Sequence, residues 1–261
     1  MEDKKENTST DLLGIAPYGE ALKIAVEKGF NGAEAILSRI CLPAAEEIGL
    51  MFRDKVRYWR LNNIIRIINK SENKIDFSNG QLELTAHPRV IKEIIENGSW
   101  CDDDGIQEMW AGILASSCNE INGDDSNLIF VNTLKQLTKN QVSILNFICQ
   151  NCKIRVDKNG LLFADHIEVS FDELCSIIGS TNLHQIDAEL DYMRSNELLM
   201  NEQNAFGCVH GAGFVFGEEK ITAHLEPSPF AINLFIKGQG YKGQPKDYFK
   251  VEYIEPEKPK Q

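Results

Sequence analysis

Apolar residues recur at the spacing of an α-helix through most of residues 11–118, and this pattern constrains the fold more than any other feature. Positions three and four apart fall on one face of a helix, which can then pack on a neighbour. The segments predicted to be helical are 11–40, 44–70, 88–97 and 102–118. Pro43 suits the first turn of the second segment, where a missing N–H costs nothing. Gly98 suits the C′ position after the third segment. The first part of the chain is therefore predicted to be all-helical.

The second half of the sequence mixes helices with predicted strands. The segments predicted to be helical are 138–151, 170–179 and 183–196. Ser170 and Glu173 have the spacing of a capping box. A glycine-punctuated stretch, 205–222, contains the run Phe-Val-Phe at 214–216 and is predicted to form strands. Three helices followed by a hairpin is the order of elements in a winged helix.

The predicted fold class is mainly α, with an N-terminal helical domain followed by a winged-helix-like α+β domain. A polar segment rich in glycine and aspartate, 119–127, is predicted to link the two. The predicted parts are a disordered leader (1–10), an all-helical domain (11–122), a winged-helix-like α+β domain (131–245) and a polar tail (246–261).

Acidic residues outnumber basic ones in the sequence of 261 residues, which has a formal net charge of -12 and a pI near 5.0. This balance disfavours general attraction to nucleic acid or anionic lipid. No segment approaches the roughly 18 consecutive apolar residues of a membrane helix. The polar start lacks a signal-peptide core, and the seven cysteines follow no disulfide framework. A cytoplasmic protein with free thiols is therefore expected.

Basic residues concentrate in the predicted helix around a single acidic residue, Asp54. They are Arg53, Lys55, Arg57, Arg60, Arg66 and Lys70. Arg57 and Arg60 fall within the apolar stripe of this helix. Because an unpaired buried charge is costly, both arginines need a partner.

Two interpretations of Arg57 and Arg60 are open. In the favoured one, they pair with acidic residues of the same chain and form a structural clamp. The candidate acidic partners are Glu46, Glu47, Asp102, Asp103 and Asp104. In the other, they bind an anionic ligand or a partner, assisted by Trp59. The three consecutive aspartates are explained by helix capping and by this pairing, because they lack the spacing of a divalent-cation loop.

No pattern in the sequence assembles a catalytic or metal site. Cys149 and Cys152 have metal-ligand spacing, and Cys208 with His210 could complete a tetrahedral set, but a second CxxC is lacking. The five histidines are scattered, and HExxH, GxSxG and GxGxxG motifs are absent. The protein is therefore expected not to be an enzyme and to use no cofactor or metal.

The predicted winged helix raises a DNA-binding hypothesis, which the charge of its third helix opposes. That helix carries Asp187, Glu189 and Asp191 against the single Arg194. Acidic side chains beside phosphates would be repelled. Nucleic acid is therefore not an expected partner, and protein contact or dimerisation is the better interpretation.

Two stretches carry the motifs of a known family. The first, 43–63, has the skeleton Pro-x-x-Glu-Glu-Ile-Gly, then Asp, then Arg-x-x-Arg-x-x-Asn. The second, 102–116, opens with acidic residues and continues with Ile-Gln and with Trp-Ala-x-Ile-Leu-Ala, which begins at Trp110. Over about residues 41–145 the sequence resembles the Abi-alpha abortive-infection family of bacterial phage-defence proteins. The resemblance implies abortive infection, in which an infected cell is stopped before phage release, and it supplies no catalytic residues.

The function expected is phage defence through binding of a protein partner, either a phage trigger or a host target. A winged-helix transcription regulator is the first alternative. A membrane-acting effector that uses the region 11–40 is the second, although packing of that region on the core is the simpler explanation. A hydrolase without a recognised motif and a homo-oligomer are also left open.

Overall fold

The computed structural model describes most of the chain between Tyr58 and Lys250. The described residues are 29, 32–33, 35–36, 39, 58–75, 84–118, 124–157, 159–200, 214–216 and 221–250. The chain divides into two compact units, one of residues 1–135 and 238–242 and the other of residues 136–237 and 243–261. The described elements are mainly helices, with strands in two small antiparallel sheets. The predicted fold class, mainly α with some β, is confirmed at this level.

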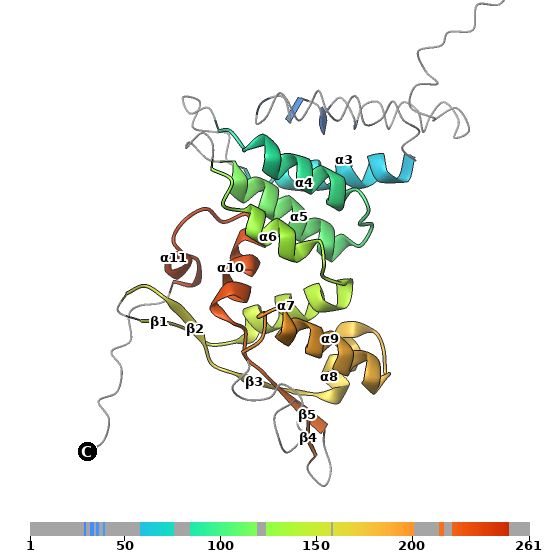
Figure 1. Ribbon diagram of the computed structural model, residues 1–261, viewed down its shortest axis with the longest axis vertical. Coiled ribbons are helices and arrows are strands. Elements are labelled where there is room, and N and C mark those ends of the chain that lie inside the picture. The colour runs from blue at the N-terminus through green and yellow to red at the C-terminus, as the bar shows by residue number, and fades with distance from the viewer. Residues whose placement is uncertain are drawn as a thin grey trace, which may run out of the picture. The chain divides into compact units, whose positions relative to one another are not determined.

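Four helices pack together in the first unit (Figure 1). They are α3 (Tyr58–Glu72), α4 (Pro88–Gly98), α5 (Asp104–Ser117) and α6 (Leu128–Leu134). The central helix is α5, which is buried along most of its length and holds the fully buried Trp110. α3 turns one apolar face inward through Leu61, Ile64, Ile67 and Ile68. Burial of each of these side chains stabilises the fold by about 1.5–3 kcal/mol. Because the four residues recur at helical spacing, one face of α3 is apolar and packs inward.

The starts of α4 and α5 follow the signals in the sequence. Pro88 opens α4, and the Arg89 N–H donates to the His87 side chain. At α5, the Ile106 N–H donates to Asp103 Oδ1 at 3.1 Å. An acidic side chain at this place also interacts favourably with the helix dipole. The predicted capping role of the acidic run is confirmed for Asp103.

Gly98 differs from its predicted role. It is the last residue of α4 and its φ is not positive, whereas a C′ glycine was predicted there. A Cβ at this position would lie 3.0 Å from Ile67 Cδ1 and 3.5 Å from Trp110 Cγ. The glycine is therefore required for close approach of the helices, not for an unusual backbone angle.

The predicted linker, 119–127, belongs in part to the first unit. Residues 119–123 lie outside the described residues. The side-chain amide of Asn127 donates to Ser117 Oγ at 2.8 Å and to Ser116 Oγ at 3.2 Å, so the end of the segment is bonded to α5. α6 follows directly and was not predicted. The division between the two compact units lies between Lys135 and Gln136.

The second unit combines helices with both sheets. α7 (Lys139–Asn151) is followed by the antiparallel pair β1 (Ile154–Val156) and β2 (Leu162–Ala164). β3 (Ile167–Ser170), α8 (Phe171–Ile178), α9 (Leu183–Ser195), β4 (Phe214–Phe216) and β5 (Ile221–Leu225) come next. β5 lies between β3 and β4, so the three-stranded antiparallel sheet has the order β3–β5–β4 (Figure 1). α10 (Pro229–Gly238) and α11 (Pro245–Phe249) follow.

The helix signals of the second half are confirmed. Thr138 and Ser170 each form a capping box, at the starts of α7 and α8. Gly179 ends α8 with a φ of 72°, a left-handed conformation that glycine adopts without strain. The strand predicted at 214–216 is β4. The hairpin β1–β2, strand β3 and helices α10 and α11 were not predicted.

The predicted polar tail, 246–261, begins inside a helix. Its first residues belong to α11, where the ring of Tyr248 lies 6.0 Å from that of Phe235 and the ring of Phe249 lies 6.5 Å from it. Residues 251–261, the leader 1–10 and most of the region 11–40 lie outside the described residues. In that region Ala33 and Ile36 are helical and buried. Among the described helices, none has the length and apolar character needed to span a membrane.

Candidate functional site

Arg60 lies against Trp100 in the helical unit, and the ring of Trp100 is close to that of Trp59. Its guanidinium carbon is 4.2 Å from the centroid of the Trp100 ring, and the Trp59 and Trp100 rings are 6.1 Å apart and tilted by 58°. A cation above an aromatic face is attracted by the quadrupole of the ring. Trp59 is 39% exposed and Trp100 is 61% exposed, so both present apolar area at the surface. We call these three residues the Trp–Arg surface.

Ser99 fixes Arg60 in this place. Arg60 Nε and Nη2 donate to Ser99 Oγ at 2.9 and 2.8 Å, and the same hydroxyl donates to the Glu96 carbonyl at 2.9 Å. Burial lowers the pKa of the Arg60 guanidinium, and the charge of Glu96 acts in the opposite direction. The usual pKa of arginine is high enough for the side chain to stay charged. The Trp–Arg surface therefore carries one fixed positive charge.

Two buried amides hold the turn that carries Ser99 and Trp100. Asn63 Nδ2 donates to the Ser99 carbonyl at 3.0 Å. Gln107 Nε2 donates to the Cys101 carbonyl at 2.8 Å and to Asn63 Oδ1 at 3.4 Å. Both amide side chains are almost fully buried. Because a buried carbonyl left unpaired costs about 1–3 kcal/mol, these bonds restrict the turn to one conformation.

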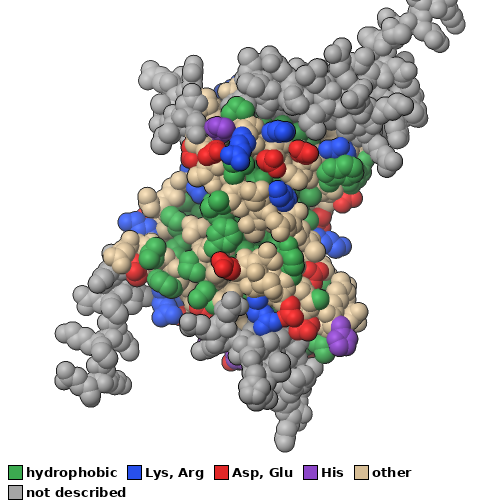
Figure 2. All heavy atoms as spheres, in the orientation of Figure 1, with side chains coloured by type: hydrophobic (Ala, Val, Ile, Leu, Met, Phe, Trp, Pro, Cys, Tyr) green, Lys and Arg blue, Asp and Glu red, His purple; other side chains and the backbone are tan. Residues whose placement is uncertain are grey.

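The acidic residues of α5 pair with lysines near the end of α3. Lys70 Nζ lies 2.6 Å from Asp104 Oδ1 and 2.7 Å from Glu108 Oε1, and Lys74 Nζ lies 3.2 Å from Glu108 Oε2. Burial is the largest single effect on the pKa of Lys70 and would lower it, but Asp104 and Glu108 together raise it above 10.5. Figure 2 shows acidic and basic side chains interspersed on the face of the first unit in view.

Arg60 contacts Ser99 and Trp100, and among the described residues it forms no ion pair with the aspartates at 102–104. Its pairing with Glu46 or Glu47 stays a prediction, because both glutamates lie outside the described residues. Asp104 and Glu108 pair with Lys70, which lies ten residues, or about 15 Å, along α3 from Arg60. Lys70 of α3 and Lys74, two residues after the end of α3, link this part of the chain to α5 through these ion pairs.

The other predicted site residues are only partly brought together. Asp102 is exposed at the surface, and Trp110 is buried inside α5. Arg53, Arg57, Glu46 and Glu47 lie outside the described residues. Ser99 and Trp100 were missed by the sequence analysis. A tryptophan directly after the end of a short helix was the available signal, because such a position has little to bury a large ring against.

The CxxC cysteines lie at the end of α7. Cys149 is buried, and its burial raises the pKa of its thiol well above the usual value. Burial, with the charges of Glu226 and Asp165, raises the pKa of Cys152 to about 12. Both thiols are therefore protonated at neutral pH, which makes them poor nucleophiles. Cys208 and His210, the other half of the predicted set, lie outside the described residues.

The fold and this site define a mainly helical protein that presents an arginine held against one of two neighbouring exposed tryptophans. The motif positions of both sequence blocks meet at this site, Arg60 and Asn63 from the first and Gln107 from the second. The chain belongs to the abortive infection alpha family, whose model matches residues 60–205. No curated protein and no solved structure matches the sequence. The family suggests a role in abortive infection, the defence against phage that the sequence analysis expected.

Proposed function

We propose that the protein acts in abortive infection by binding a protein partner through the Trp–Arg surface, in the cytoplasm and without catalysing a reaction. The observation that carries this proposal is the pair of exposed tryptophans with Arg60 held beside them. Tryptophan and arginine are the residue types most enriched among those that dominate binding energy at protein interfaces. A partner that covers both rings removes their apolar area from water.

The hydrogen bonds that hold the turn of Ser99 and Trp100 also favour binding. Ser99 and the two amides of Asn63 and Gln107 hold the turn before a partner arrives. Side chains that are already ordered lose less conformational entropy when a complex forms. The fixed charge of Arg60 favours a partner that offers a carboxylate, because arginine and carboxylate can form two parallel hydrogen bonds.

A phage assay with matched variants tests the proposal. Trp100→Ala removes the most exposed ring of the surface, and Ile129→Ala removes an exposed apolar side chain of α6 as a control. The assay uses a phage that the wild-type gene restricts, and it records plaque numbers and phage release in a single growth cycle. We expect Trp100→Ala to lose at least about tenfold of the protection, since loss of a dominant interface residue costs about 2 kcal/mol or more. Ile129→Ala should protect like the wild type.

A stability measurement completes this experiment. The melting temperature of each variant shows whether lost protection follows from unfolding. The proposal requires a Trp100→Ala protein that is folded and inactive. A folded Trp59→Ala/Trp100→Ala variant that still protects fully would contradict it.

A second candidate is a transcription regulator, and the order of elements in the second unit favours it. Apart from the hairpin β1–β2, which lies between α7 and β3, the order α7, β3, α8, α9, β4 and β5 is that of a winged helix. The charge of α9 opposes DNA binding. Glu189 accepts hydrogen bonds from Thr138 and Asn140, and Asp191 pairs with Arg194. This leaves α9 little positive charge for phosphates.

A gel shift with duplex DNA at physiological salt decides between these candidates. We expect no tight, sequence-selective binding, because non-specific attraction also requires a basic surface. Selective binding at nanomolar concentration would favour the regulator. The membrane-acting alternative depends on the region 11–40, which lies largely outside the described residues.

A further inference from the structure

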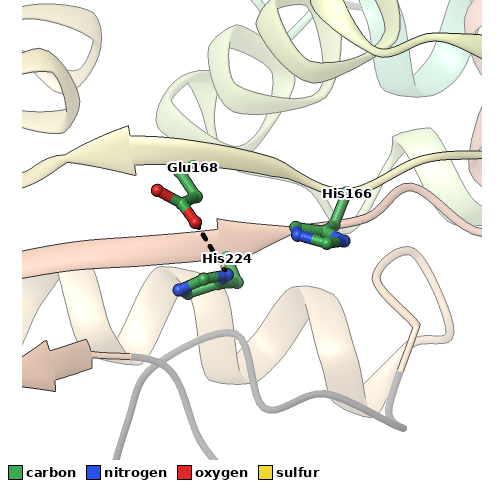
Figure 3. Close-up of side chains that lie close together, drawn as sticks. All are labelled: His166, Glu168 and His224. Carbon is green, nitrogen blue, oxygen red and sulfur yellow. Dashed lines mark ion pairs between the residues drawn. The ribbon is translucent and has the colours of Figure 1, made fainter.

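We propose that His166, Glu168 and His224 bind a divalent transition-metal ion, with zinc the best fit. Figure 3 shows the three side chains gathered on the sheet of the second unit, from β3, the residues just before it and the neighbouring strand β5. Their possible ligand atoms all lie within 4.8 Å of one another. The proposal is independent of the Trp–Arg surface, because these residues belong to the other unit.

Strand register explains why these residues meet. Glu168 on β3 is the direct antiparallel partner of His224 on β5. His166 lies two positions before Glu168, and residues two apart on an extended chain point to the same side. The His224 Nδ1 atom lies 3.9 Å from Glu168 Oε1, and the two imidazole rings are 5.5 Å apart. In sequence the two histidines are scattered, so only sheet pairing reveals the cluster.

The ligand types select the class of metal. Imidazole nitrogen suits zinc and its neighbours in the first transition row, whereas Mg²⁺ and Ca²⁺ prefer sites made of oxygen ligands. Zinc binds histidine nitrogen at about 2.0–2.1 Å, so two ligand atoms on one tetrahedral ion are about 3.3 Å apart. Moving from 4.8 Å to that spacing requires only small rotations of the side chains. His166 and Glu168 are exposed and have room to rotate.

Three protein ligands leave a coordination position open. Structural zinc sites have four protein ligands, whereas sites with three keep a place for water or for a group from another molecule. Since the cluster is at the surface, that place faces outward. The proposed ion would therefore be available to an outside ligand and not sealed within a core.

Metal titration of the full-length protein tests the proposal. Co²⁺ binding is followed by visible absorption and Zn²⁺ binding by calorimetry, in wild type, His224→Ala and Glu168→Gln. The control is His184→Ala, which removes an exposed histidine of α9 outside the cluster. We expect one ion per chain in the wild type. Each cluster variant should bind at least about tenfold more weakly, since even loss of a second-shell partner costs 10–100-fold. His184→Ala should bind normally.

Cysteine thiols could bind the metal in place of the proposed histidine and glutamate ligands. The visible spectrum of bound cobalt distinguishes the two kinds of site. Thiolate ligands give cobalt a strong charge-transfer band, which imidazole and carboxylate do not. Cys152→Ser should bind cobalt like the wild type. The proposal would be overturned if the wild type showed no saturable metal binding, or if the cluster variants bound metal as tightly as the wild type. It would also be overturned if the wild type showed a thiolate band that Cys152→Ser lacked. Circular dichroism verifies that each variant is folded. If His224→Ala is unfolded, the single variants His166→Ala and Glu168→Gln test the proposal instead.

Discussion

The guanidinium group of Arg60 stacks on the ring of Trp100, with 4.2 Å between its carbon and the ring centroid. This contact joins α3 to the turn after α4. The same turn receives Asn63 from the first motif and Gln107 from the second. Two motifs about forty residues apart in sequence therefore support one surface, which gives a physical reason for their occurrence together.

Arg60→Ala should lower the free energy of unfolding by about 1–2 kcal/mol. The variant loses hydrogen bonds to one hydroxyl and a partly exposed cation–π contact, which are individually modest. Ser99 keeps its bond to the Glu96 carbonyl. Thermal melting measures the effect, and Arg66→Ala, an exposed arginine of the same helix, is the control.

The size of this loss distinguishes two accounts of Arg60. Removing one partner of a buried ion pair costs about 3–5 kcal/mol. A loss of that size would favour the predicted clamp, in which Arg60 pairs with Glu46, Glu47 or one of the aspartates at 102–104. Arg60→Lys should recover little of the lost stability, because a lysine can neither stack on the ring nor donate in the same planar geometry.

Asn63→Ala should destabilise the protein by about 1–3 kcal/mol, because it leaves the buried Ser99 carbonyl without its donor. Gln107 also loses an acceptor, although its bond to the Cys101 carbonyl remains. The midpoint of urea unfolding measures the change. Asn69→Ala, at an exposed position of the same helix, should shift the midpoint little. Equal shifts in the two variants would show that the buried amide is not structural.

The sequence predicted local elements well where one short-range signal decides them. Capping residues marked the starts of α5 and α8, and Gly179 marked the end of α8. β3 and the hairpin β1–β2 were missed, because strands of three or four residues carry too little periodicity to detect by themselves, and these lack the glycine-punctuated surroundings that marked β4. Helix α6 was missed because its neighbouring polar residues were interpreted as a linker.

The Trp–Arg surface could be predicted only in part, because the residues that form it are distant from one another in sequence. The need of Arg60 for a partner followed from its position on an apolar stripe, but the hydroxyl and the indole ring that contact it among the described residues were not foreseen. No pattern in the sequence relates position 60 to position 99. His166 and His224 illustrate the same limit, since the register of β3 and β5 alone brings them together.

Glu108→Gln should weaken the dependence of stability on acid pH. Burial is the largest single effect on the pKa of Glu108 and would raise it, but Lys70 and Lys74 together lower it below 4.5. The carboxylate of Glu108 therefore binds a proton more readily in the unfolded state than in the folded state. The stability that Glu108 contributes is present above about pH 4.5 and is lost as the pH falls below that value. Glu108 is 44% exposed, so solvent screening limits the effect to about 1 kcal/mol.

Unfolding by urea at several acid pH values measures this contribution. The slope for Glu108→Gln should be shallower than for the wild type, and Glu72→Gln, at an exposed position of α3, is the matched control. The raised pKa of Lys70 acts at the other end of the pH range. Its contribution is full below pH 10.5 and is lost as the pH rises beyond the folded pKa. Equal acid slopes in wild type and Glu108→Gln would contradict the pairing.

Gly98→Ala should destabilise the protein, although alanine is intrinsically the better helix former by about 1 kcal/mol. The new Cβ would lie 3.0 Å from Ile67 Cδ1, and Ile67 is fully buried and cannot move freely. Overpacking of this kind costs about 1–3 kcal/mol, which equals or exceeds the gain in propensity.

Ile67→Val removes the Cδ1 atom and relieves the contact. In a double-mutant cycle, Gly98→Ala should therefore cost less in the Ile67→Val background than in the wild type, by about 0.5 kcal/mol or more. Strict additivity of the two substitutions would show that Gly98 is needed for some reason other than this close approach.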